Sequence, residues 1–233
     1  MSKQATINPD SLGGIALFFD LTADQIQSLC GLLRCKIFPA GKTIINADQP
    51  GEAIYFILDG TVKVHLEQAD GADVVVSILG AGDSIGEMSL LDNKTRSASV
   101  STIEESTLLW MDRAAFLECL TTIPHLTLNL ACILAKRLRH ANHQIQALAS
   151  REVESRVAYQ ILIFAERYGK ATANGDIFIP IRLTQSDIAS MIGASREHTN
   201  KVIVSYKERK YISIDSQYHI IVHNQQALLS RCQ

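Results

Sequence analysis

Glycine is distributed unevenly along this chain of 233 residues. Ten of the 13 glycines lie at or before Gly86, and no glycine occurs from Glu87 to Tyr168. Glycine favours turns and is unfavourable inside a helix by roughly 0.5–1 kcal/mol relative to alanine. The distribution therefore predicts short strands joined by turns in the first part of the chain and long helices in the next part. We expect an α+β fold.

Residues 35–111 have the pattern of short strands separated by turns. The apolar run 54–58 and the alternating run 61–65 flank Asp59-Gly60, a dipeptide typical of a tight hairpin. A second turn is expected at Asp70-Gly71. Short strands at regular spacing are typical of a β-barrel or a jelly roll.

A long helical region is expected between Arg113 and Ala149, where Pro124 is the only proline. Small and apolar residues repeat there at intervals of three and four, and the charged side chains lie off this stripe. The stripe consists of Ala131, Leu134, Leu138, Ala141, Ile145 and Leu148. A stripe this narrow favours the seam of a parallel coiled-coil dimer, and the alternative is a helix that lies on its own barrel. Asn142 flanks the seam and could fix the register of two helices.

A second pattern, between residues 181 and 202, predicts a helix-turn-helix. Thr184 can cap a first helix, and Asp187 three residues later strengthens that N-terminus. Gly193 makes the turn, and Ser195 caps a second helix. The residues from Tyr211 to Val222 then supply a pair of strands.

The second of these helices carries charged side chains on the face that we expect to be exposed. Arg and Lys suit the acceptors of guanine and Glu suits the amino group of cytosine, so these side chains are candidates for reading bases in the major groove. The charge run 207–210 is either a phosphate contact or a solvated surface. The DNA-binding candidates, some for bases and some for phosphates, are Thr184, Gln185, Ser195, Arg196, Glu197 and Lys201.

The stretch from Gly86 to Val100 places a carboxylate, a guanidinium and a hydroxyl close to a glycine. Glu87 can accept from a sugar hydroxyl, Arg96 can neutralise a phosphate through its planar fork of donors, and Ser97 can donate to the same phosphate. Gly86 allows a ligand to approach the backbone closely. These groups suit a ribose phosphate; the alternative is a surface salt bridge between Glu87 and Arg96.

This stretch resembles the phosphate-binding cassette of cyclic-nucleotide-binding domains, in which Gly-Glu is followed, after a short variable turn, by Arg, Ser or Thr, and Ala. The resemblance implies that Glu87 binds the ribose 2′-hydroxyl and that Arg96 and Ser97 bind the cyclic phosphate. The candidates for binding the nucleotide here are Gly86, Glu87, Met88, Ser89, Arg96, Ser97 and Ala98.

Both motif regions, in this order over roughly residues 15–225, resemble the Crp/Fnr family of bacterial transcription regulators, in its cyclic-nucleotide-responsive branch. The resemblance implies a cyclic-nucleotide-binding β jelly roll over residues 1–127, a dimerisation helix over 128–150 and a winged helix-turn-helix over 151–233. The implied function is that of a homodimeric, sequence-specific DNA-binding regulator that a cyclic nucleotide, above all cAMP, controls allosterically. Whether it activates or represses transcription stays open.

The resemblance to the family implies a second possible role for Asn142, a contact with the base of the nucleotide. In the cyclic-AMP receptor proteins of this family, a Thr-Ser pair on the long helix contacts the adenine, and Ala141 and Asn142 align with that pair. Ala141 cannot form the hydrogen bond, whereas Asn142 has both a donor and an acceptor and is a candidate for contacting the base. The choice between cAMP, cGMP and another effector therefore stays open.

The recognition helix of the family carries Ser-Arg-Glu and a second Arg four residues after the Glu, and it reads a TGTGA-type half-site. Arg196 and Glu197 match this motif, but Lys201 replaces the second Arg and gives a single-point contact instead of a fork. The expected partners are a palindromic double-stranded DNA site and a second copy of the chain. RNA polymerase stays open as a further partner.

Composition and motifs argue against several other classes. The net charge is −2, and it divides into −5 for residues 1–150 and +3 for residues 151–233, which suggests an acidic sensor joined to a mildly basic module. We find no catalytic motif and no metal-ligand spacing, so we expect neither an enzyme nor a metal. No run approaches the ~20 apolar residues of a membrane span, so we expect a cytoplasmic protein with no membrane contact.

The five cysteines are scattered and odd in number, which argues against a disulfide framework; we expect buried apolar thiols.

Two alternative functions remain. One is a regulator of the same family that senses another small effector, such as 2-oxoglutarate or haem. The other is a cyclic-nucleotide-binding module that does not act on DNA. Retention of Glu87 and Arg96 argues against the first, and the helix-turn-helix argues against the second.

Overall fold

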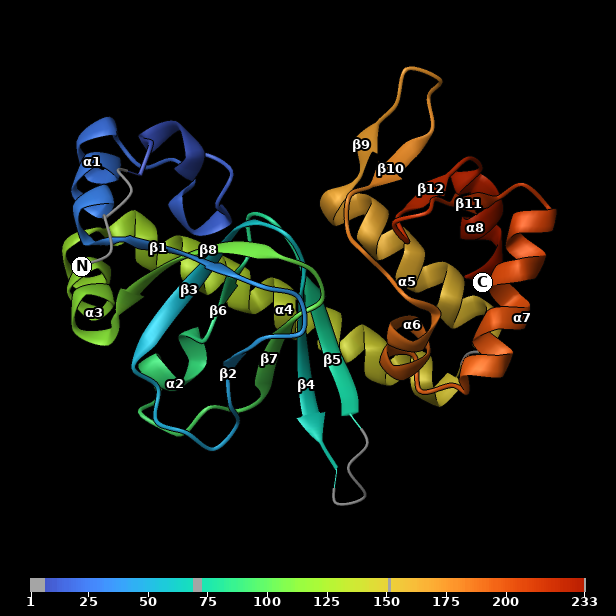
Figure 1. Cartoon of the computed structure of the whole chain (residues 1–233), viewed down its shortest axis with the longest axis horizontal. Helices are drawn as coiled ribbons and strands as arrows, with labels where there is room; N and C mark the ends of the chain where they lie inside the picture. Colours follow the sequence, from blue (N-terminus) through green and yellow to red (C-terminus); the bar gives the residue numbers. More distant parts are fainter. Residues whose placement is uncertain (1–6, 69–72, 151, 233) are drawn as a thin grey trace. The chain divides into compact units, whose positions relative to one another are not determined.

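The computed structural model describes residues 7–68, 73–150 and 152–232. The chain forms two compact units, one made of the residues up to 138 without 73–75, and one made of 73–75 and the residues from 139 onward (Figure 1). The turn predicted at Asp70-Gly71 lies outside the described residues. The predicted α+β class, jelly roll, long helix and winged helix-turn-helix are confirmed.

The first unit begins with short helices, η1 (Pro9–Leu12), η2 (Ala16–Phe18) and α1 (Ala23–Leu32). Over the described residues, eight strands follow in two four-stranded sheets, with the orders β1-β8-β3-β6 and β2-β7-β4-β5. The first three residues of β5 are grouped with the second unit. The strands are β1 (Arg34–Phe38), β2 (Thr43–Ile45), β3 (Ala53–Asp59), β4 (Val62–Glu67), β5 (Asp73–Leu79), β6 (Ser84–Ile85), β7 (Ser99–Thr102) and β8 (Ser106–Asp112).

The predicted hairpin at Asp59-Gly60 is wrong. Strand β3 pairs with β8 and β6, whereas β4 pairs with β7 in the other sheet. Gly60, at φ +89°, carries the chain from one sheet to the other, and a Cβ there would collide with the Ser106 hydroxyl. Ile57 and Val62 are fully buried in the core cluster that includes residues of both sheets. Alternating apolar residues around a glycine are therefore compatible with a crossing from one sheet to the other as well as with a hairpin.

Two apolar clusters hold this unit together. The cluster that draws on both sheets consists of Phe38, Ile45, Ile57, Val62, Leu79, Ile85, Val100 and Leu108. The other joins the N-terminal helices, strands β3 and β8, helix α3 (Arg113–Thr122) and the start of helix α4 (Pro124–Ser150). Its rings Phe18 and Phe56 lie with their centroids 4.8 Å apart.

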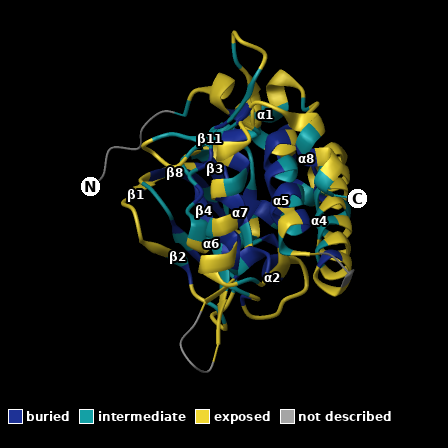
Figure 2. Cartoon of the chain, turned by 90° about the vertical axis from the view of Figure 1, so that its right-hand side faces the viewer, coloured by how far each residue is buried: buried dark blue, intermediate teal, exposed yellow. Residues whose placement is uncertain are grey.

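The helical region breaks just before Pro124, which occupies the first position of α4, where its missing N–H costs nothing. Along its first half, α4 buries Leu126 and Leu130 in the core of the unit. Leu134, predicted to lie in the seam, is half-buried against the same cluster. The alternative of a helix on its own barrel thus holds for this face. Another face stays exposed, as the yellow residues along α4 in Figure 2 show.

The second unit contains the rest of α4 and a winged helix-turn-helix. Its remaining helices are α5 (Val153–Tyr168), α6 (Gln185–Met191), α7 (Arg196–Glu208) and α8 (Gln225–Arg231). Its strands, in the sheet order β11-β12-β10-β9, are β9 (Lys170–Ala171), β10 (Ile177–Ile179), β11 (Ile212–Ile214) and β12 (Ile220–Val222). Helix α5 packs against α7 and α8, and it buries Val157, Ile161 and Phe164.

None of the five cysteines, all of which are described, forms a disulfide. The prediction of buried thiols holds for Cys119 but is wrong for Cys35 and Cys132, which are exposed; Cys30 and Cys232 are half-buried. Within the part of the chain that the structure describes, no three His, Cys, Asp or Glu residues gather as metal ligands. Over the same residues, no single helix is long and apolar enough to span a membrane. Helices α3 and α4 have the required length and hydropathy only when taken together, and they are bent by 108° relative to each other.

Candidate nucleotide-binding and DNA-binding sites

The predicted nucleotide cassette begins at a tight turn between strand β6 and the short helix α2 (Glu87–Leu91). Gly86 precedes this helix at φ +87°, a conformation that favours glycine. A Cβ at Gly86 would lie 2.6 Å from Arg96 Nη1 and 3.2 Å from the Ala53 carbonyl oxygen. The glycine is therefore needed because the arginine side chain crosses directly over the turn.

Arg96 is buried and holds the cassette together. Its Nη1 donates to the Gly86 carbonyl at 2.6 Å and to the Ser89 hydroxyl at 3.0 Å, and its Nη2 donates to the Ala53 carbonyl at 2.7 Å. Burial lowers the pKa of the Arg96 guanidinium, and the nearby Tyr55 and Glu87 oppose this shift. The side chain stays charged at neutral pH, and these bonds leave two of its five N–H donors for an anion.

Glu87 is also buried, with 2% of its surface exposed. Its Oε1 accepts from Arg137 Nη1 on α4 at 2.7 Å, and Arg137 Nη2 also donates to the Ser84 carbonyl at 2.6 Å. The other carboxylate oxygen, Oε2, is buried and has no hydrogen-bond partner among the described residues. A buried acceptor without a donor is uncommon, and a ligand hydroxyl is one group that could supply the missing bond.

The alternative of a surface salt bridge between Glu87 and Arg96 is wrong. Both side chains are buried, and each bonds to other groups. The two charges still attract each other: the negative charge of Glu87 raises the pKa of Arg96, against the lowering caused by burial.

Arg137 is the residue that sequence reasoning missed. It is one of the charged residues off the apolar stripe of α4, and it lies fifty residues after Glu87 in the chain. The sequence contains only an indirect indication of this contact. A buried carboxylate needs a cation or several hydrogen-bond donors, and Arg137 of α4 is the cation that Glu87 has.

The remaining candidates of the cassette lie around this pair of charged side chains. Ser89 is buried and accepts from Arg96. Ser97 and Met88 are exposed and adjacent, with the Ser97 hydroxyl 3.9 Å from the Met88 sulfur, and Ala98 is half-buried. The Ser97 hydroxyl thus has only a weak acceptor and is open to a stronger one. Ala141 and Asn142 are exposed on α4.

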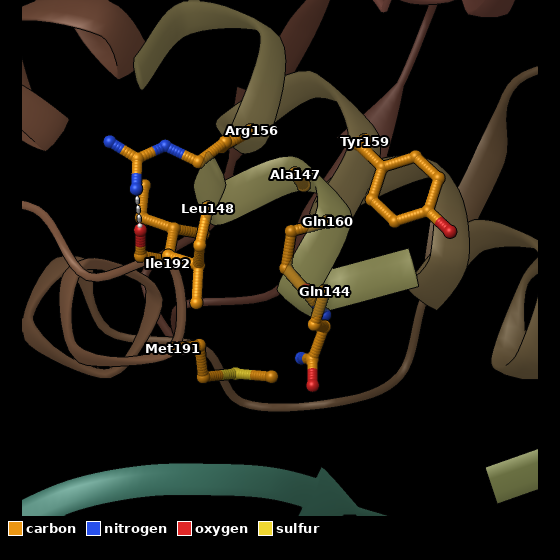
Figure 3. Close-up of a pocket in the computed structure, with 8 residues that line it drawn as sticks. All are labelled: Gln144, Ala147, Leu148, Arg156, Tyr159, Gln160, Met191 and Ile192. Carbon is orange, nitrogen blue, oxygen red and sulfur yellow. Dashed lines mark hydrogen bonds between the residues drawn. The ribbon is translucent and has the colours of Figure 1, made fainter. Parts of the chain in front are cut away.

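The second unit has a small cleft of its own, shown in Figure 3. Arg156 of α5 donates from Nη1 to the Ile192 carbonyl at the end of α6, at 2.6 Å. Leu148 of α4 lines the same cleft, and a Cβ at Gly193 would lie 3.0 Å from its Cδ2. The one cation among the residues that line the cleft is therefore already bonded to the protein. Leu148 and Arg156 bring α4 and α5 into contact with the turn between α6 and α7.

The helix-turn-helix has the predicted caps. Thr184 and Asp187 form a capping box, in which the Thr184 hydroxyl accepts from the Asp187 N–H at 3.2 Å and the Asp187 carboxylate accepts from the Thr184 N–H at 3.1 Å. Ser195 accepts from the His198 N–H at 3.2 Å and caps α7. Gly193 makes the turn at φ +60°. Gln185 is half-buried at the start of α6.

The three charged candidates of α7 all lie in solvent. Arg196, Glu197 and Lys201 are exposed, while Val202 and Ile203 of the same helix are buried. Lys201 Nζ lies 2.8 Å from Glu197 Oε1, in an ion pair whose side chains are 71% and 81% exposed. The side chains at the start of α7 are therefore free to contact a groove, and they add little to the fold.

Comparisons with known proteins identify the two domains in which these candidate residues lie. The family described as "Cyclic nucleotide-binding domain" matches residues 35–122, and the family described as "Crp-like helix-turn-helix domain" matches residues 155–231. The chain is 32% identical to a "CRP-like cAMP-activated global transcriptional regulator" of Mycobacterium tuberculosis, over 90% of this chain and 93% of that protein. It is 29% identical to a "Cyclic AMP receptor protein" of Thermus thermophilus, over 86% and 89% of the two chains.

Among solved structures, FixK2 of Bradyrhizobium japonicum has the same fold, with a TM-score of 0.76 and 19% identity over 86% of this chain and 98% of the other. The matched domains and the identity to the mycobacterial regulator cover most of the chain in the same order. The chain therefore belongs to the Crp/Fnr family of transcription regulators, which are not enzymes.

Proposed function

We propose that this regulator binds cAMP in the cassette around Glu87 and Arg96, and that as a homodimer it binds a palindromic DNA site. The observation that carries the effector proposal is the pair of buried charged side chains in the cassette. Glu87 keeps one buried oxygen without a donor, and Arg96 keeps two donors without an acceptor. A ribose hydroxyl and a cyclic phosphate supply these missing partners.

The names of the two relatives support cAMP as the nucleotide, since one is called cAMP-activated and the other a cyclic AMP receptor protein. The cassette candidates Gly86, Met88, Ser89, Ser97 and Ala98 would surround the sugar phosphate. Asn142 would contact the base, in place of the Thr-Ser pair of cyclic-AMP receptor proteins. Because Ala141 provides no hydrogen bond, cGMP is the first competitor to test.

The homodimer proposal rests on the exposed face of α4. Leu128, Leu138 and Ile145 are 58%, 64% and 66% exposed, and Asn142 is exposed between the last two. Leu138 and Ile145 are seven residues apart, which is one heptad, and Leu128 and Asn142 are separated by two heptads. Two positions that repeat in this way define the a and d seam of a coiled coil. A second copy of the chain would cover this face, with Asn142 in the seam.

Nucleotide binding would act on DNA binding by a population shift. The Glu87–Arg137 ion pair ties the cassette to α4, so a ligand that contacts Glu87 favours the arrangements of α4 that are compatible with it. The connection between α4 and α5 that would transmit this shift includes Arg151, which lies outside the described residues. Arg196, Glu197 and Lys201 would then read a TGTGA-like half-site, with Thr184, Gln185 and Ser195 positioning the helix on the backbone.

Calorimetric titration of the purified protein with cAMP and with cGMP, followed by DNA binding with and without the tighter nucleotide, tests this proposal. We expect saturable binding of cAMP and a tighter complex with a TGTGA palindrome when cAMP is present. If neither nucleotide binds, the effector proposal is wrong, and an effector of another class, such as 2-oxoglutarate or haem, takes its place.

The role of Asn142 is tested separately with Asn142→Ala. A contact with the base predicts weaker nucleotide binding, by about the 0.5–1.5 kcal/mol of one hydrogen bond. A role in the seam alone predicts unchanged nucleotide affinity and altered dimer stability. Titration calorimetry and sedimentation of the same variant distinguish the two roles.

A further inference from the structure

A second cluster of polar and charged side chains lies at the opposite end of α7 from the base-reading residues. Lys207, Lys210, Ile212, Ser213 and His223 line an open depression with about 590 Å³ of empty space. This depression lies in one unit of the structure, between the end of α7 and strands β11 and β12. Nothing in the cyclic-nucleotide cassette or in the start of α7 accounts for it.

The polar wall of the depression is a chain of hydrogen-bonded side chains. Asp176 Oδ2 lies 2.9 Å from His223 Nδ1, and His223 Nε2 lies 2.8 Å from the Ser213 hydroxyl. The three residues come from the turn before β10, the end of β12 and β11, which are brought together by the sheet. Asp176 therefore fixes the His223 ring by accepting from Nδ1–H. When Nε2 also carries a proton, it donates to the Ser213 oxygen, and the Ser213 O–H is left to donate to an anion.

The cationic wall consists of Lys207 and Lys210. Both are exposed, and neither forms an ion pair with any residue of the described ranges. Lys207 lies in the last turn of α7, where a cation favours the negative end of the helix dipole, so its position alone could be explained by helix stability. Lys210 is different, because it lies beyond the helix at φ +57°, where glycine or asparagine is usual.

Two ammonium groups and an oriented hydroxyl around one hollow are the groups that bind a phosphate. Ser213, His223 and Asp176 also have the order of an acyl-transfer triad. Catalysis of that kind needs an oxyanion site shielded from water, and this depression is open, with flexible ammonium groups as its cations. The chemistry of the hollow therefore favours binding of an anion over covalent catalysis.

We propose that Lys207, Lys210, Ser213 and His223 form a phosphate-binding site that is separate from the nucleotide cassette. The phosphate belongs either to the DNA backbone or to a small phosphorylated molecule. Helix α7 has 13 residues and thus a length of about 20 Å. A DNA phosphate bound here would lie well away from the bases that Arg196 and Glu197 contact.

The DNA arm of the test measures the salt dependence of binding, with the full-length protein and a DNA of unrelated sequence. This arm rests on the proposed DNA binding, but it needs neither a TGTGA site nor cAMP. For Lys207→Gln/Lys210→Gln we expect the slope of log Kobs against log salt to become less steep by about 1, the value for one lost phosphate. Lys170→Gln, which removes an exposed lysine of β9, is the control and should leave the slope unchanged.

The second arm titrates the full-length protein with inorganic phosphate at constant ionic strength and pH. The ring signal of His223, identified by its loss in His223→Gln, reports binding. A saturable shift that the double lysine variant lacks, together with an unchanged salt slope, assigns the site to a small phosphorylated molecule. A changed salt slope without a saturable shift assigns it to the DNA backbone.

Ser213→Ala distinguishes a built site from a general positive patch, because it removes the hydroxyl and keeps every charge. In the arm that responds, with inorganic phosphate or with DNA, we expect it to weaken the affinity roughly tenfold, as the loss of a hydrogen bond to a charged group does. If Ser213→Ala behaves like the wild type, or if the double lysine variant changes neither arm, the proposed site does not exist. Nucleotide titration of the same variants keeps this result separate from a failure of the effector proposal, since none of these residues belongs to the cassette.

Discussion

The cassette and the recognition helix both carry charged side chains, but they hold them in opposite ways. In the cassette, Glu87 and Arg96 are 2% and 7% exposed and bonded to backbone carbonyls and to other side chains. On the recognition helix, Glu197 and Lys201 are 81% and 71% exposed and bonded only to each other. A buried ion or donor that loses its partner costs several times more than an exposed one.

Because the two sites differ in burial, substitutions in them have different consequences. A substitution in the cassette changes the fold and the ligand site together, because the same atoms serve both. A substitution on the exposed face of α7 changes what the helix can bind and leaves the fold almost unchanged. Stability measured beside binding therefore tells whether each region behaves as its burial predicts.

The largest effect is expected for Arg96→Ala. The change leaves the Gly86 and Ala53 carbonyls and the Ser89 hydroxyl without their donor, and it removes the cation for the cyclic phosphate. We expect nucleotide binding to be lost and the free energy of unfolding to fall by about 3 kcal/mol. Calorimetric titration with cAMP and denaturant unfolding measure the two effects.

The control for this prediction is Lys94→Ala, which removes an exposed cation two residues away. It should bind nucleotide and unfold like the wild type. An Arg96→Ala variant with full affinity for cAMP would show that the cassette is not the nucleotide site.

Arg137→Gln is expected to have the next largest effect. It leaves the Glu87 carboxylate buried without its cation and removes a donor from the Ser84 carbonyl. Because Arg137 is itself 30% exposed, water can replace part of the interaction, and we expect a loss of about 1–3 kcal/mol in the free energy of unfolding. Urea unfolding measures it, with Arg139→Gln, an exposed neighbour on α4, as the matched control. Equal stability of the two variants would contradict a structural role for the ion pair.

These buried partners mark the limit of what the sequence could predict. The cassette and the helix-turn-helix follow from local patterns: Gly86 before Glu87, Thr184 and Ser195 as caps, Gly193 at the turn. The partner of Glu87 could not be found in that way, since Arg137 lies far along the chain and local spacing says nothing of which distant residues meet. The prediction of a hairpin at Asp59-Gly60 was wrong for the same reason. Which strands pair with β3 and β4 depends on distant parts of the roll, β8 and β7, and not on the turn between them.

The seam stripe shows a third kind of limit. Periodicity correctly predicted apolar positions along one helix, but it merged two faces of α4 into one. Leu134 packs on the core of its own unit, while Leu138 and Ile145 stay exposed. A stripe in the sequence cannot tell whether a neighbour belongs to the same chain or to another.

On the recognition helix, Glu197→Ala should change DNA recognition and leave stability nearly unchanged, unlike the cassette variants, which lose stability. The exposed ion pair with Lys201 contributes about 0.3 kcal/mol or less, so the free energy of unfolding should hardly change. Discrimination at one base pair of the half-site should fall by about 1–3 kcal/mol. Selection from a random DNA pool, with the wild type beside the variant, measures this as relaxed preference at a single position. A large loss of stability would mean that Glu197 is part of the fold after all.

The smallest effect, and the finest test of the comparison, is expected for Lys201→Arg. Lysine offers one compact charge that bonds to Glu197 in the free protein, whereas arginine offers a planar fork that matches the two acceptors of guanine. The substitution keeps the charge and the ion pair, so stability and salt dependence should stay the same. Preference for guanine at the base that Lys201 contacts should rise by up to about 1 kcal/mol, the lower end of the value for one bidentate pair. Binding to two DNA sites that differ only at this base measures the change, and equal preference in both proteins would show that residue 201 contacts the backbone and not a base.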